Sequence, residues 1–221
     1  METGLTEEFA RRLSLAAAGL TLRQFDGWPN DADAALIDSV LSTRSRYITT
    51  VLPRVHAWMA SPLRPAGRDL HAIVTAGPEV LAEVLHTRQL VPGRSPNRLT
   101  KIAAIVDVAT RLTANEPRLN TAAELRAAAH TDYAGLRRLI QETRGVGPAQ
   151  SSYFLMLLGV QGVKADTLVT SFVTRHVKSP RALGPNDIEA IVAGAAALLG
   201  CTSVALDHAI WAKESAARAG R

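Results

Sequence analysis

The stretch from Arg144 to Val173 most constrains the fold, because it places a glycine-bracketed turn between two helical segments. Apolar residues recur at helical spacing over positions 133–143, and a short apolar helix is expected at 153–158. The turn between them reads Gly145-Val146-Gly147-Pro148. Two glycines permit positive φ, and proline suits the first turn of the second helix. Backbone N–H groups at that helix start favour an anion, which predicts a phosphate-binding hairpin. The alternative is an ordinary corner between two helices.

A carboxylate follows the apolar helix, at the expected start of a further helix. This residue, Asp166, lies nineteen positions after Gly147 in the segment Gly162–Val169. The hairpin and this segment together resemble the helix-hairpin-helix, Gly-Pro-Asp (HhH-GPD) superfamily of DNA glycosylases, which includes endonuclease III. The matching positions are Gly145, Val146, Gly147 and Pro148 in the hairpin, and Asp166, Thr167 and Val169 in the aspartate segment. The sequence departs from the family pattern at Thr143-Arg144, where the family has leucine-proline, and at Leu168, where it has histidine.

The resemblance implies that Asp166 is the catalytic residue and that the hairpin residues bind DNA. Cleavage of an N-glycosidic bond builds positive charge on the sugar, and a nearby carboxylate stabilises that charge and orients the attacking water. An aspartate before Thr-Leu-Val is also a typical helix N-cap, so a purely structural role for Asp166 is the alternative. Without catalysis, the same hairpin describes a DNA-binding module that lacks enzymatic activity.

A second segment, Leu41-Ser42-Thr43-Arg44, is similar to the Leu-Ser-x-Gln motif of the same family. There a polar side chain fills the space that a flipped base leaves in the duplex, which assigns this DNA-binding role to Arg44. An arginine can stack on bases and hydrogen-bond an unpaired partner. The alternative is a solvated basic helix end. For the base pocket the aromatic candidates are Tyr47, Tyr153 and Trp28, each of which is also a plausible core residue.

Whether the reaction also cleaves the DNA strand depends on a nucleophilic lysine. Bifunctional members of the family carry a lysine two residues after the second hairpin glycine, and this sequence has Ala149 there, followed by Gln150. We therefore expect monofunctional excision by water. Lys164, close to Asp166, is assigned a DNA contact, with an amine nucleophile as the alternative. In the glycosylase family the helix equivalent to the one expected from Leu99 opens with a basic residue near the DNA, and Arg98 and Lys101 fit that position loosely.

Composition permits a nucleic-acid partner without requiring one, since 25 basic residues against 20 acidic ones give a net charge of +5. The single cysteine, Cys201, excludes the four-cysteine iron–sulfur cluster of several relatives. The histidines show no metal-ligand spacing, so we expect no metal and no cofactor. The first residues carry no signal-peptide pattern, and no apolar run is long enough to cross a bilayer. We expect a monomer in the cytoplasm, associated with the nucleoid and not with a membrane.

Helical periodicity dominates the whole chain, which predicts an all-α fold. The resemblance implies two lobes: residues 31–150 as a helical bundle that ends in the hairpin, and residues 1–30 plus 151–221 as a second lobe with Asp166 at its edge. DNA is expected in a cleft between them. The predicted function is a monofunctional DNA N-glycosylase that acts on a flipped damaged or modified base in double-stranded DNA.

Overall fold

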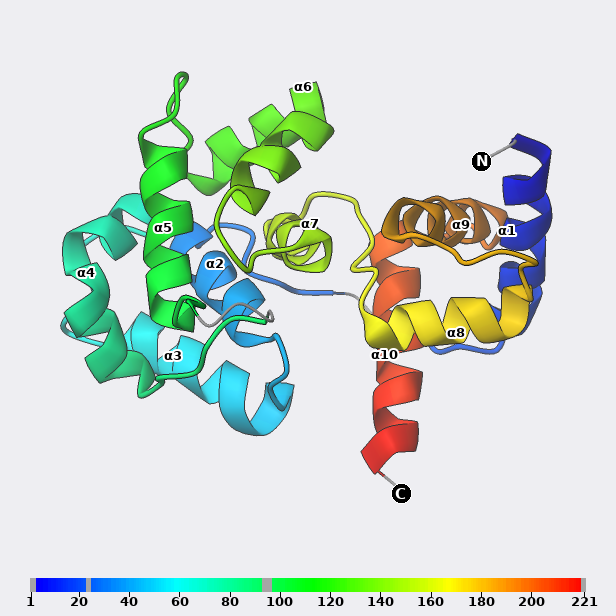
Figure 1. Cartoon of the computed structure of the whole chain (residues 1–221), viewed down its shortest axis with the longest axis horizontal. Coiled ribbons are helices and arrows are strands. Elements are labelled where there is room, and N and C mark those ends of the chain that lie inside the picture. The colour runs from blue at the N-terminus through cyan, green and yellow to red at the C-terminus, as the bar shows by residue number, and fades with distance from the viewer. Residues whose placement is uncertain (1–2, 23–24, 93–96, 220–221) are drawn as a thin grey trace. The chain divides into compact units, whose positions relative to one another are not determined.

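The structure is a computed structural model that describes residues 3–22, 25–92 and 97–219. These residues form an all-α protein, as predicted, and the only β-pairing among them is an isolated bridge between Leu90 and Thr100 (Figure 1). The helices are α1 (Thr3–Ala17), α2 (Ala32–Leu41), α3 (Leu52–Ala60), α4 (Leu70–Leu85), α5 (Lys101–Thr113), α6 (Ala122–Gln141), α7 (Pro148–Leu157), α8 (Thr167–Val177), α9 (Pro185–Leu198) and α10 (Ser203–Ala219). A π-helical segment, η1 (Tyr47–Val51), precedes α3.

The chain divides into two compact units. Residues 27–160 form one, called here the central unit, and residues 1–26 with 161–221 form the other, called the terminal unit. The division differs from the predicted boundary at residue 150, because α7 belongs to the central unit. Ser151 to Leu158 are all buried, and α7 packs on α2 and α6, so its apolar surface is covered there. Trp28 also belongs to the central unit, where its backbone N–H donates to the Leu157 carbonyl at 2.6 Å.

Helix α2 is the centre of the central unit. All ten of its residues are buried, and it packs against α3, α4, α5 and α7 (Figure 1). A helix that is apolar on nearly every side is expected in a core. The exceptions are Asp33, Asp38 and Ser39, which are buried too and therefore need hydrogen-bond partners.

Asp31 and Asp33, at the start of α2, connect this helix to other parts of the central unit. Asp31 is at the N-cap position but its side chain makes no capping hydrogen bond. Instead, Asp33 accepts hydrogen bonds from Trp58 Nε1 and Arg64 Nε, both at 2.8 Å, and Asp31 accepts one from Arg64 Nη2 at 3.1 Å. Burial lowers the pKa of Arg64, but its bonds to the two aspartates outweigh burial and raise it. The two carboxylates thus join α2 to the 61–64 segment and to α3.

Three helix starts have local causes in the sequence. Thr121 forms a capping box with Glu124 at the start of α6. Helix α4 bends at Gly77, whose φ is 72°, so that a new helical stretch starts at Pro78. Helix α6 bends at Asp132, whose side chain accepts a hydrogen bond from the Gly135 N–H at 2.8 Å. This last bend directs the second half of α6 toward the glycine-bracketed turn.

The terminal unit is a four-helix assembly of α1, α8, α9 and α10, in which α1 packs on α8 and α9, and α10 packs on the same two helices. Its core includes Phe9, Leu13, Phe172, Ile188 and Ile210. Among the described residues no single helix is long and apolar enough to cross a membrane, although the bent pair α9–α10, at 106°, meets the length and composition criteria together.

Candidate nucleic-acid interface and catalytic carboxylate

The glycine-bracketed turn joins α6 to α7 through Thr143–Gly147, and its two glycines are not equivalent. Gly145 has a φ of 87°, and a Cβ there would lie 2.2 Å from Val91 Cγ2. Gly147 has a φ of −103° and a ψ of −176°, which is extended backbone that any residue adopts. Of the two glycines, only Gly145 uses the positive φ that glycine permits. The Val146 side chain is buried and anchors the turn, and its backbone N–H donates to the Thr143 carbonyl at 3.1 Å.

The polar groups of the turn are partly used within the protein. Gln150 accepts a hydrogen bond from the Gly147 N–H at 2.8 Å and donates one to the Gly145 carbonyl at 3.2 Å. The Ala149 N–H, in the first turn of α7, has no acceptor among the described residues. At the start of α7, the Ala149 N–H is therefore available to a phosphate directly, whereas the Gly147 N–H is available only when Gln150 moves.

Thr143 shows why this sequence departs from the family pattern in front of the hairpin. Its side chain is buried, and its hydroxyl donates to Asp107 Oδ2 of α5 at 2.6 Å. Burial raises the pKa of Asp107, but the hydrogen bonds from Thr143 and Arg111 outweigh burial and lower it. A polar residue is thus satisfied at the position where the glycosylase pattern has leucine. Arg144 is exposed, and its Nη1 donates to the Asn97 carbonyl at 3.0 Å.

Residues Leu41–Ser45, called here the Arg44 loop, connect the end of α2 to the segment before η1. Arg44 is exposed and has a φ of 52°. A left-handed conformation in a non-glycine residue is uncommon and persists where surrounding contacts impose it. Nearby on η1, Ile48 is 67% exposed, which is unusual for a large apolar side chain beside a basic loop. The loop and η1 together present cationic and apolar groups on one short stretch.

Lys101 supports this loop and is not a surface contact. It is only 2% exposed, which contradicts the expected position near DNA. Its Nζ lies within hydrogen-bonding distance of four acceptors: Leu41 O at 2.9 Å, Thr43 O at 2.6 Å, Ser45 Oγ at 3.0 Å and Gln89 Oε1 at 2.9 Å. Burial, with the charge of Arg54 second, lowers the pKa of Lys101 to about 8, so the ammonium form still predominates at neutral pH.

The three aromatic residues assigned to a base pocket converge on one buried carboxylate, Asp38. Asp38 Oδ2 accepts hydrogen bonds from Trp28 Nε1 at 2.8 Å and from the Tyr47 hydroxyl at 2.9 Å. Oδ1 accepts one from the Ser42 hydroxyl at 2.9 Å. Tyr153 is hydrogen-bonded to Tyr47 and Ser42. These five residues are called here the Asp38 cluster.

The cluster has a buried side and a more accessible side. Asp38 and Tyr153 are buried, whereas Trp28 and Tyr47 are half-buried. Burial, followed by the charge of Asp38, raises the pKa of both tyrosines, so both stay protonated and can donate hydrogen bonds. Asp38 itself was not singled out from the sequence. The available signal was a carboxylate inside an otherwise apolar helix, which requires a buried partner.

Asp166 is the N-cap of α8, in the terminal unit. Its Oδ1 accepts hydrogen bonds from the N–H groups of Leu168 at 2.8 Å and Val169 at 3.0 Å. Its Oδ2 accepts no hydrogen bond from any described residue, and the side chain is half-buried. The capping role is therefore present, and one carboxylate oxygen is left for other chemistry.

A second carboxylate, Asp207 of α10, lies near Asp166 and was not predicted. It is 4% exposed, and its Oδ1 accepts a hydrogen bond from the Lys164 backbone N–H at 2.9 Å. Burial, followed by the charge of Asp166, raises the pKa of Asp207 well above its ordinary value. Asp207 thereby fixes the backbone just before Asp166. No local pattern around position 207 indicates this contact, because its partner is 43 residues away in sequence.

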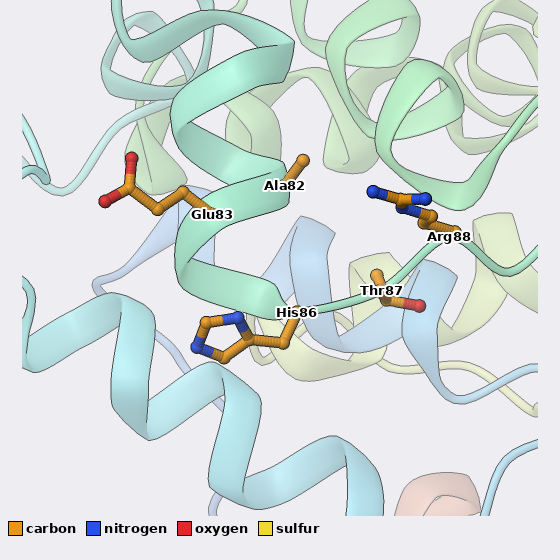
Figure 2. A pocket seen from close by; sticks show the side chains of 5 residues that line it. All are labelled: Ala82, Glu83, His86, Thr87 and Arg88. Carbon is orange, nitrogen blue, oxygen red and sulfur yellow. The ribbon is translucent and has the colours of Figure 1, made fainter.

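The predicted site residues fall in two groups. The central unit contains the hairpin residues, Arg44 and the aromatic side chains of the Asp38 cluster, whereas Asp166 and Lys164 belong to the terminal unit. A pocket of about 470 Å³ at the end of α4 contains none of them. It is lined by Ala82, Glu83, His86, Thr87 and Arg88, and Figure 2 shows Glu83 pointing away from Arg88. This lining supplies no convergent set of polar groups.

The chain belongs to the family described as "Domain of unknown function (DUF8548)", whose model matches residues 15–215. No curated protein and no solved structure matches the chain.

Proposed function

We propose that this protein is a monofunctional DNA N-glycosylase of the two-lobed HhH-GPD type, which removes a damaged or modified base from double-stranded DNA. The observation that carries the proposal is the Asp38 cluster. It gathers, around one buried carboxylate, the three aromatic residues that the sequence assigned to a base pocket.

The Asp38 cluster and the Arg44 loop are joined through Ser42. This residue donates to Asp38 and is itself part of the loop, two positions before Arg44. A base-excising enzyme needs a pocket for the extruded base and a side chain that fills the space left in the duplex. Stacking of a base on an aromatic side chain contributes about 1–3 kcal/mol, comparable with the few kcal/mol that base extrusion costs. Half-buried Trp28 and Tyr47 suit such stacking.

Asp166 supplies the chemistry in this proposal. As the bond between C1′ and the base nitrogen breaks, positive charge develops on the sugar, and the carboxylate stabilises it. Water then forms the new C1′–O bond and gives up a proton to Asp166. Asp166 Oδ1 is held by two N–H groups of α8, and Oδ2 remains for the water or the sugar. Since Ala149 stands where a nucleophilic lysine is required, the product is an intact abasic site.

Incubation with a panel of duplexes that contain damaged or modified bases, followed by alkali, tests the activity by revealing abasic sites as strand breaks. The variant Asp166→Asn keeps the size and much of the capping capacity of the residue but removes its charge. We expect excision to fall by about 10²-fold or more in this variant, while DNA binding persists.

Asp187→Asn is the matched control, because Asp187 also caps a helix of the terminal unit, through the Gly184 N–H at 3.0 Å. It should leave excision unchanged. Near-normal excision by Asp166→Asn would remove Asp166 from the mechanism. DNA binding by the wild type without excision of any base would instead establish a non-catalytic helix-hairpin-helix protein.

A further inference from the structure

Lys101 is a buried lysine whose ammonium group donates hydrogen bonds to the Arg44 loop. We propose that Lys101 is a positioning residue for DNA insertion: it holds the Arg44 loop in the conformation from which Arg44 enters the duplex. This inference rests on the proposed function, because it assigns a role to Lys101 only if Arg44 acts on DNA.

The contacts of Lys101 bracket Arg44 in the chain. Its Nζ hydrogen-bonds the Thr43 carbonyl immediately before Arg44 and lies 3.0 Å from the Ser45 hydroxyl immediately after it. An ammonium group has three protons for four neighbouring acceptors. The acceptor that receives no lysine proton is Gln89 Oε1, and it can accept one from the Ser45 hydroxyl, which lies 3.2 Å away. The whole group is therefore satisfied only while Lys101 carries its charge.

The conformation of Arg44 depends on such a constraint. Its φ of 52° belongs to the left-handed region, which costs a residue with a Cβ free energy relative to the right-handed helical region. The Lys101 ammonium group also donates a hydrogen bond to the Leu41 carbonyl, at the C-terminal end of α2, where the helix dipole favours a cation. Without the ammonium group, the Leu41 carbonyl would lose its partner, and the Thr43 carbonyl would keep only a long contact of 3.4 Å to the Ser45 hydroxyl. The loop would then relax, and the direction of the Arg44 side chain would change with it.

The same lysine connects the Arg44 loop to the hairpin within the central unit. Its backbone N–H donates to the Gln89 carbonyl at 2.7 Å, and two residues on, the Val91 N–H donates to the Leu99 carbonyl at 3.0 Å. Val91 is the residue against which Gly145 packs. The paired segments 89–91 and 99–101 therefore contact the hairpin at one end and the Arg44 loop at the other. Lys101 sets the loop relative to the hairpin.

The test compares binding to a duplex that contains an abasic site with binding to the intact duplex. An abasic site offers the space that Arg44 would fill, so the ratio of the two affinities measures insertion. We expect Arg44→Ala to reduce this ratio by about tenfold, the effect of one lost stacking contact. Lys101→Met, which keeps an unbranched apolar stem, should reduce it to a similar degree. The double variant should lose no more than either single variant, because both changes remove the same insertion.

Two further variants separate positioning from general loss of stability. Ser45→Ala removes one hydroxyl from the Lys101 group and should reduce the ratio in the same direction by a smaller factor. Val55→Ala, in the buried core of the same unit but outside the Lys101 contacts, should lower stability and leave the ratio unchanged. Additive losses in the double variant, or a normal ratio in both Lys101→Met and Ser45→Ala, would overturn the proposal. If the wild type itself does not prefer the abasic duplex, the proposed function fails first.

Discussion

Replacement of each hairpin glycine by alanine should change stability in opposite directions. At Gly145 the φ of 87° becomes unfavourable once a Cβ is present, at a cost of about 1–2 kcal/mol. The new Cβ would also lie 2.2 Å from Val91 Cγ2 and 2.7 Å from Val91 Cβ, and relief of this overlap adds about 1–3 kcal/mol. Gly145→Ala should therefore lower the free energy of unfolding by about 2–5 kcal/mol.

Gly147 differs in both respects. Its backbone is extended, and a Cβ there would lie 3.5 Å from Gln150 Oε1, an ordinary van der Waals contact. Alanine at a compatible position stabilises by about 0.4–1 kcal/mol, because it restricts the unfolded chain. Urea unfolding of the two variants measures both changes in the free energy of unfolding. A slope of the transition equal to that of the wild type shows that only stability has changed. Equal destabilisation by the two changes would refute the assignment of positive φ to Gly145 alone.

The tolerance of Gly147 also makes it the cleaner probe of DNA binding. Gly147→Val places a branched side chain beside the Ala149 N–H without disturbing the turn, since β-branched residues suit extended backbone. If a phosphate binds at this helix start, affinity should fall by about tenfold or more, the effect of losing a hydrogen bond to a charged group. The wild type should also show a steep dependence of affinity on salt. Unchanged affinity in the folded Gly147→Val variant would exclude the hairpin as the phosphate anchor.

Two further predictions concern the pocket and the nucleophile. Asp38→Asn keeps the side-chain volume but turns one acceptor oxygen into a donor amide that faces other donors. We therefore expect the free energy of unfolding to fall by about 1–3 kcal/mol and excision to fall with it. Normal stability in urea unfolding and normal excision in the alkali assay would show that the cluster does not depend on the carboxylate. Borohydride reduction during turnover on a confirmed substrate should trap no protein–DNA adduct. An adduct that forms with the wild type and disappears in Lys164→Ala would make Lys164 the nucleophile and the enzyme bifunctional.

The elements of the fold that sequence predicts best are those with a local physical cause. The capping box at Thr121 and the helix break before Pro78 each depend on residues within one turn of the chain. The helix after Asp166 begins one residue later, as its capping pattern indicates. The all-α class follows from helical periodicity in the same way. In each case the residues that decide the structure are close in sequence.

The parts of the candidate site that sequence misses depend on partners far apart in the chain. Lys101 bonds to Leu41 and Thr43 across 60 and 58 positions, so its burial leaves no local signal, and a loose family match placed it at the surface. Asp38 is similar, because only the fold brings Trp28 and Tyr153 to it. The end of the central unit also depends on distant partners, because α7 is covered by α2 and α6 and so belongs with the residues before it.

The departures from the glycosylase pattern share a consequence for how this chain would hold DNA. Gln150 occupies the Gly147 N–H, and only the Ala149 N–H is left at the start of α7. With the Gly147 N–H occupied, the hairpin contributes less to affinity than the resemblance implies, so the balance of phosphate binding shifts to exposed arginines such as Arg144. Arginine contacts release counterions, whereas a backbone N–H releases none. In the proposed complex, removal of Arg144 should therefore flatten the salt dependence of binding by about one phosphate contact, while Gly147→Val should weaken binding and leave that slope unchanged.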